Sequence, residues 1–190
     1  MSFHSVALII HVLAVFVLCS VLCIEGLALT HLRTASTVSE ALPWIEPVRR
    51  LRSFAVGSVL TVQFSGLYLV FQTSSLGQPW PKVAMVALPL LMAPFGNMTA
   101  RRMRAIREAF RLQDASKSEL LSMVRAPFLK ISLGVRIAAF FGVFLLVSVK
   151  PGLWGSIGLL CALLSISLLS SVVPWPRRST ALRPIHEQEN

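Results

Sequence analysis

The sequence is poor in charged residues, and in acidic ones above all. Only 14% of its 190 residues are charged, with 8 Asp and Glu in total, whereas a soluble domain is about 25% charged. Apolar residues make up 55% of the chain. They lie in runs long enough to cross a bilayer, which takes about 20 residues per helix. This composition excludes an ordinary soluble domain and predicts an integral membrane protein.

Cysteine and N-terminal positive charge are also scarce. Cys19, Cys23 and Cys161 all lie in apolar runs, and an odd number of cysteines in such positions gives no disulfide framework. No Lys or Arg precedes Arg33, although a cleavable signal peptide normally begins with a basic segment. We therefore expect the first apolar run to be retained as a membrane span.

The apolar runs predict an all-α fold, an integral membrane bundle of five transmembrane helices. The last two spans come from one run that is too long for a single crossing. Lys150, Pro151 and Gly152 interrupt this run, and proline beside glycine marks a turn. A bundle of four helices is the alternative. Residues 1–176 would form a single transmembrane domain, followed by a tail of residues 177–190. The predicted spans are residues 3–29, 54–72, 82–98, 131–149 and 153–173.

The basic residues predict the orientation of the bundle. Connections rich in Lys and Arg remain cytoplasmic, which places the loop of residues 99–130 inside. With the N-terminus outside and the C-terminus cytoplasmic, residues 30–53 and the tail also lie inside, and only Lys82 and Lys150 lie in outer loops. Four spans would put the arginines of the tail outside. The basic residues of the 99–130 loop are Arg101, Arg102, Arg104, Arg107, Arg111, Lys117, Arg125 and Lys130. Since the positive charge follows the membrane connections, we expect no nucleic-acid partner.

Two connections carry further structural signals. Pro43, Trp44 and Pro47 predict an interfacial turn with an aromatic anchor within residues 30–53. In the 99–130 loop, Met103, Ile106 and Phe110 recur at helical spacing with arginines between them. This pattern predicts an amphipathic helix that continues out of the membrane.

Polar side chains inside spans are costly and are therefore functional candidates. In the first span, His4, His11 and Glu25 fall within about 60° of one another on the helix, with Leu18 between the last two. They could line a proton path, an ion path or a ligand face. Alternatively, His11 only bonds a neighbouring helix. The candidate polar sites within the membrane are His11, Glu25, Gln63 and Arg136.

Glu25 and Arg136 lie near the same end of their spans. They could form an ion pair, which would lower the cost of burying both charges. The alternative is that Arg136 extends to the lipid headgroups. Gln63 and Tyr68 are polar enough to bond across a helix interface.

A haem or copper site is a further alternative. Ligation of haem by two histidines needs a second histidine in another span, and His11 has none within the monomer. A second copy of the chain, Met85 or Met92 would have to supply the other ligand. Cys19 and Cys23 share a helix face and could bind Cu(I), or they could simply pack as small apolar residues. We expect no cofactor and no metal.

Small residues recur at steps of three and four in two spans, where they would let helices approach closely. One row is Gly57, Thr61 and Ser65, and the other is Gly155, Gly158, Ala162 and Ser165. The sequence contains no phosphate-binding loop, nucleophile elbow, zinc-ligand spacing or internal repeat.

The order of spans resembles a group of small bacterial multi-pass integral membrane proteins of unknown function. The resemblance rests on His11, on the string Ser65-Gly66-Leu67-Tyr68-Leu69 and on Val149-Lys150-Pro151-Gly152-Leu153. There is a looser similarity to copper-resistance-type membrane proteins, although this chain lacks the further histidines and methionines of such a site. The resemblance implies a location in the bacterial cytoplasmic (inner) membrane and implies no activity.

We therefore expect a non-enzymatic membrane protein, either an accessory subunit or a small transport-related component. Its partners would be the lipid bilayer and either other membrane subunits or a second copy of the chain. The alternative function is a redox protein that binds haem or copper through His11.

Overall fold

The computed structural model describes residues 3–35, 37–112 and 127–172, and all regular structure in these ranges is helical. A short 3₁₀ helix, η1 (Ser75–Gly77), joins the second long helix to the third. All five long helices are long and apolar enough to cross a membrane, which confirms the all-α prediction. The long helices are α1 (Phe3–Thr34), α2 (Val38–Gln72), α3 (Pro79–Leu112), α5 (Pro127–Val149) and α6 (Leu153–Val172).

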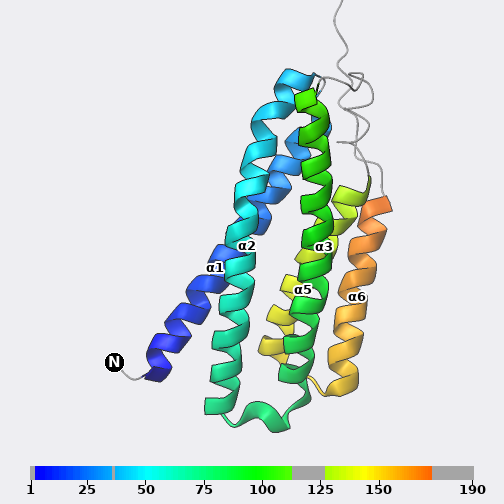
Figure 1. The fold of residues 1–190 in the computed structure, drawn as a ribbon. Helices are drawn as coiled ribbons and strands as arrows, with labels where there is room; N and C mark the ends of the chain where they lie inside the picture. The colour runs from blue at the N-terminus through cyan, green and yellow to red at the C-terminus, as the bar shows by residue number, and fades with distance from the viewer. Residues whose placement is uncertain (1–2, 36, 113–126, 173–190) are drawn as a thin grey trace, which may run out of the picture.

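The helices run alternately up and down (Figure 1). α1 and α2 form a hairpin, and α3, α5 and α6 form a second group that packs on it through the pairs α2–α3 and α1–α5. The predicted break at Lys150 separates α5 from α6, and Lys150 adopts a positive φ of 51° in the turn. The predicted tail, residues 177–190, lies outside the described residues.

The predicted interfacial turn within residues 30–53 is wrong. α1 continues to Thr34 and α2 begins at Val38, so Pro43 and Pro47 lie inside a helix. The reason is tertiary packing: Ala41, Ile45 and Val48 recur at helical spacing and are all buried. Their packing outweighs the loss of two backbone donors at the prolines, which a helix normally tolerates poorly. Trp44 stacks on the His31 ring, with 4.3 Å between the centroids.

The predicted extension of the third span is confirmed. α3 continues without a break to Leu112, and Met103 and Ile106 are buried while the arginines between and beside them are exposed. The side chain of Phe110, the third residue of this pattern, lies outside the described set. Beyond its apolar segment, α3 is therefore an amphipathic helix.

Three buried apolar clusters follow one another through the bundle. The first joins the ends of α1 and α3 to the start of α2 and of α5, and includes Leu32 and Ile106. The second brings together α1, α2, α3 and α5 around Leu18 and Met92. The third joins α3, α5 and α6. The first cluster lies where the basic residues are densest, so the bundle has a packed core beyond its apolar spans.

The predicted small-residue row on α6 is not a helix contact. Gly155, Gly158 and the other two residues of the row are exposed, and no atom lies within 4 Å of a Cβ placed on Gly158. Close approach of α5 to α6 instead depends on Gly134 and Gly142. A Cβ on these glycines would lie 2.6 Å from Ser167 Oγ and 2.5 Å from Leu160 Cδ2, respectively.

Candidate functional site

A buried ion pair joins α1 to α5. Arg136 donates from Nη1 to Glu25 Oε2 at 2.7 Å and from Nη2 to Glu25 Oε1 at 2.5 Å. The side chains are only 6% and 7% exposed, respectively. This paired, two-bond geometry is the one in which an arginine and a carboxylate bind each other most strongly. Of the two alternatives for Arg136, the structure therefore has the ion pair and not the extension to the headgroups.

The ion pair belongs to a polar network that reaches a third helix. Arg136 Nε also donates to the carbonyl of Ser132, at 3.3 Å. The Ser132 hydroxyl donates to the carbonyl of Phe95 on α3 at 2.8 Å and lies 2.6 Å from the Thr99 hydroxyl. Because every buried polar group here has a partner, burying the two charges is less costly than burying either alone. The network fixes α1, α5 and α3 relative to one another.

A cavity of about 650 Å³ lies between α2 and α3, and Glu25 and Arg136 form part of its wall. Its volume is in the range of about 300–1,000 Å³ that is typical of ligand sites. Much of the wall is apolar and comes from both helices, with Val59 on α2 and Met92 on α3 as examples. The cavity therefore connects an apolar interior to a buried pair of charges.

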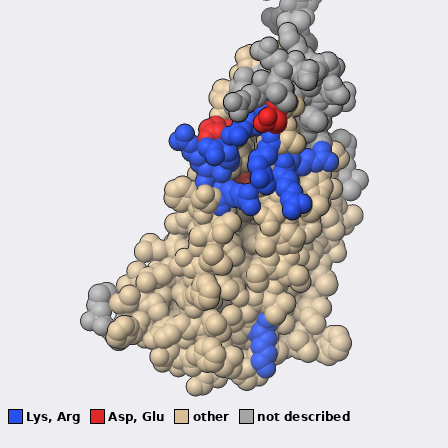
Figure 2. All heavy atoms as spheres, viewed as in Figure 1, with Lys and Arg blue, Asp and Glu red and all other residues tan. Residues whose placement is uncertain are grey.

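Four arginines line the basic end of this cavity, and we call them the rim: Arg49 and Arg52 on α2, and Arg104 and Arg107 on α3. Figure 2 shows Lys and Arg gathered in one band on this face, near the end of the bundle that holds the α1–α2 turn. In the sequence, these arginines indicate only the topology of the chain. The rim was not predicted, because a turn within residues 30–53 would not present the helical face that brings Arg49 and Arg52 opposite α3.

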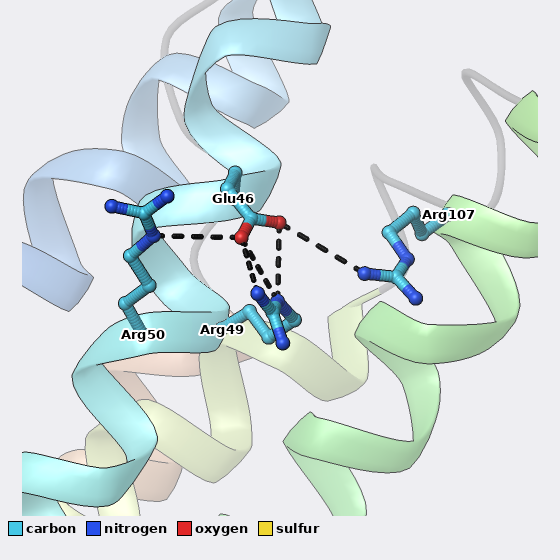
Figure 3. Close-up of polar contacts among 4 residues, drawn as sticks. All are labelled: Glu46, Arg49, Arg50 and Arg107. Atoms are coloured by element: carbon cyan, nitrogen blue, oxygen red, sulfur yellow. Dashed lines mark hydrogen bonds and ion pairs between the residues drawn. The ribbon is translucent and has the colours of Figure 1, made fainter.

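Glu46 connects the two sides of the rim (Figure 3). It lies on the part of α2 that precedes the apolar run, and it accepts hydrogen bonds from Arg49 Nε (3.0 Å) and Nη2 (2.5 Å). Arg50 Nε lies 3.5 Å from the same carboxylate, and Arg107 Nη1 of α3 lies 3.9 Å from it. The hydrogen bonds from Arg49, together with the charges of Arg49 and Arg50, hold the pKa of Glu46 below its usual range.

The other two rim arginines have no carboxylate partner. Arg52 Nη2 donates to the neutral side chain of Asn97 on α3, at 2.8 Å. Arg104 has no hydrogen-bond or ion-pair partner among the residues that the structure describes. The rim thus carries more positive charge than Glu46 neutralises. Clustered cations without counter-charges attract an anion.

The remaining predicted polar residues make ordinary contacts between helices. His11 Nδ1 lies 2.9 Å from the hydroxyl of Ser65 on α2, and this hydroxyl in turn donates to the Thr61 carbonyl. Gln63 donates to the Met85 carbonyl of α3 at 2.7 Å, as predicted for a bond across an interface. Tyr68 instead accepts a bond from within its own helix.

The polar stripe predicted on α1 is not continuous. His4 is exposed, and the side chain of Leu18, which is only 1% exposed, separates His11 from Glu25. His11 bonds Ser65 on α2 and Glu25 bonds Arg136 on α5, so these residues do not form one path. Cys19 packs against the central apolar cluster while Cys23 is exposed.

Within residues 3–35, 37–112 and 127–172, no group of three or more His, Cys, Asp or Glu side chains is arranged to hold a metal ion. The haem and copper alternatives through His11 stay predictions. No known protein family, curated protein or solved structure matches the chain. The resemblance to small bacterial membrane proteins stays a prediction.

Proposed function

We propose that the chain is a non-enzymatic, small transport-related protein of the bacterial cytoplasmic membrane, and that the cavity between α2 and α3 is its ligand site. The observation that carries this proposal is the combination in one cavity of the arginine rim, an apolar wall and the buried pair Glu25–Arg136. Ionisable groups at membrane depth are typical of substrate and ion pathways. Convergent polar groups in a largely apolar cavity are typical of ligand sites.

The proposal includes an orientation, with the rim on the cytoplasmic side. It is supported by the gathering of basic residues at one end of the bundle, since such segments resist translocation. The N-terminus would then lie outside. The cavity would open toward the cytoplasm and the inner leaflet.

Thiol labelling tests whether the cavity admits a solute. In a chain whose three cysteines are replaced by alanine, Ala93→Cys introduces a thiol into the cavity wall, where Ala93 is exposed. Phe64→Cys is the matched control, because Phe64 is 68% exposed but does not line the cavity. We expect a charged, impermeant thiol reagent to modify Ala93→Cys at least tenfold faster than the control in vesicles with the cytoplasmic face outward. Equal rates would refute a solute-accessible ligand site.

An accessory-subunit role is the second candidate. It is supported by α6, whose row of Gly155, Gly158, Ala162 and Ser165 faces outward, away from the other helices. Such rows allow close packing with a further helix in a membrane. Purification in mild detergent should then yield a complex or a homo-oligomer. A monodisperse monomer would contradict this role without affecting the ligand site.

A further inference from the structure

We infer that the ligand of the α2–α3 cavity is an anionic phospholipid, whose phosphate binds between Arg52 and Arg104 and whose acyl chain lies along the apolar wall. This inference rests on the proposed function in one respect only, because it takes the same cavity as the ligand site. It adds the chemical class of the ligand and the way the ligand enters.

The positive charges of the rim arginines favour an anion at the basic end of the cavity. Arg49 and Arg107 share Glu46, whereas Arg52 bonds only the neutral Asn97 and Arg104 has no partner among the described residues. These two guanidiniums, neither of which has a carboxylate partner, line the same cavity from opposite helices. Arginine binds phosphate through two parallel N–H bonds. A phosphate between the two helices would therefore supply the counter-charge that the protein itself does not.

The apolar wall of the cavity favours a ligand that also has an apolar chain. Next to the rim, the cavity is lined by Val56, Val59 and Leu60 of α2 and by Pro89 and Met92 of α3. An inorganic anion would cover only the rim and leave this wall in contact with water or lipid. A ligand with a charged head and a long hydrocarbon tail satisfies both parts. Basic pockets between helices at the cytoplasmic face are known to take anionic lipid headgroups.

The side of the cavity is open, which favours a lipid over a soluble amphiphile. Val56 and Leu60 line the cavity and are still 51% and 50% exposed. On α3, a Cβ placed on Gly96 would have no atom within 4 Å. These residues belong to helices that could span the membrane, so the opening faces the hydrocarbon of the bilayer. A phospholipid can enter sideways without leaving the membrane.

Binding is tested on the full-length protein in a neutral detergent, using phosphatidylglycerol as the probe. The comparison lipid is phosphatidylcholine with the same acyl chains, and the soluble comparison is inorganic phosphate. We expect phosphatidylglycerol to raise the thermal unfolding midpoint saturably and to remain bound at one molecule per chain in native mass spectrometry. The other two probes should bind at least tenfold more weakly.

Two pairs of variants locate the site. The double variant Arg52→Gln with Arg104→Gln should weaken phosphatidylglycerol binding at least tenfold, whereas Arg101→Gln, a charge change on α3 outside the cavity, should not. A Cβ added at Gly96 meets no atom within 4 Å, so Gly96→Leu is chosen to fill the cavity and should also abolish binding. Gly57→Leu is its control, because Gly57 also has open space around it but lies outside this cavity.

The outcomes separate the two proposals. Equal binding of phosphatidylglycerol to the cavity variants and to their controls would overturn the inference. Binding of phosphatidylcholine as tight as that of phosphatidylglycerol would also overturn it. If inorganic phosphate binds as tightly as the lipid, the site takes a free anion, and the proposed function stands while the lipid is refuted. Should Gly96→Leu fail to fold, the arginine variants still decide the matter. Failure of the Ala93→Cys labelling, with phosphatidylglycerol still bound at the cavity, would refute entry of a water-soluble solute and leave the lipid site standing.

Discussion

Breaking the pair Glu25–Arg136 is the sharpest test of the structure. Both side chains are almost fully buried, and each is the other's only charged partner among the described residues. Glu25→Gln leaves a buried guanidinium that stays charged at any accessible pH. Arg136→Gln leaves a carboxylate, which can take up a proton and become neutral. We therefore expect both variants to be destabilised, and Glu25→Gln to be the more damaging.

The expected magnitude follows from the geometry of the contact. Removing one partner of a buried, doubly hydrogen-bonded pair costs about 3–5 kcal/mol. For a chain of this length, each kcal/mol lowers the unfolding midpoint by about 2–4 °C, so the loss for Glu25→Gln is about 6–20 °C. The double variant Glu25→Gln with Arg136→Gln places two amides in the same space, where they can bond each other. It should recover at least about 1.5 kcal/mol of the summed single losses.

Thermal unfolding in detergent, followed by the fluorescence of a thiol-reactive or tryptophan probe, measures all three variants. Glu46→Gln is the control, because it removes an exposed carboxylate from the rim and should change the midpoint little. Additive losses in the double variant would refute the pairing. If the double variant loses more stability than the two single variants together, the two charges serve separate networks.

Three further predictions use other contacts. Ser65→Ala removes the hydroxyl that contacts His11 and should cost about 0.6 kcal/mol, the mean for polar contacts between membrane helices, as measured by the unfolding midpoint. Gly142→Val should destabilise more strongly, since even one added carbon would lie 2.5 Å from a side chain of α6; an unchanged midpoint would contradict this helix packing. In intact cells, an impermeant thiol reagent should label Lys150→Cys and should label Arg50→Cys only after permeabilisation. The reverse pattern would overturn the proposed orientation.

Much of the helix pattern could be predicted from the sequence. Lys150, Pro151 and Gly152 interrupt an apolar run, and the chain turns there in the structure because no helix continues well through proline and glycine. Hydropathy also located the end of α2 at Gln72, and the helical spacing of Met103, Ile106 and Phe110 predicted the extension of α3 past Met98. These signals are local, so they do not depend on what the helix packs against.

The start of α2 could not be predicted in the same way. Pro43 and Pro47 are strong local signals for a turn, and they outweighed the weaker repeat of Ala41, Ile45 and Val48. Only the burial of that repeat against α1 and α3 decides in favour of a helix. The place of Arg49 and Arg52 in the rim could not be predicted for the same reason, because the direction of a side chain on α2 depends on the helix being there.

The cavity follows from an unequal division of helix contacts. α2 packs mainly on α1, and α3 packs mainly on α5, where Ser132 bonds both Thr99 and the carbonyl of Phe95. Between α2 and α3, the polar links include Arg52 to Asn97, Glu46 to Arg107 and Gln63 to the Met85 carbonyl. Beside them, Gly96 leaves open space, since no atom lies within 4 Å of a Cβ placed on it.

The ion pair and the cavity therefore lie at the same interface, between the α1–α2 hairpin and the group of α3, α5 and α6. Glu25 belongs to the α1–α2 hairpin and Arg136 to the group of α3, α5 and α6, so their bonds tie the two groups together from within. A phosphate held by Arg52 and Arg104 would tie the same two groups together at the rim. Since both contacts would resist separation of the two groups, any opening that admits or releases a ligand would have to proceed around the buried pair. Under the proposed transport role, Glu25–Arg136 would then be the fixed point of the motion.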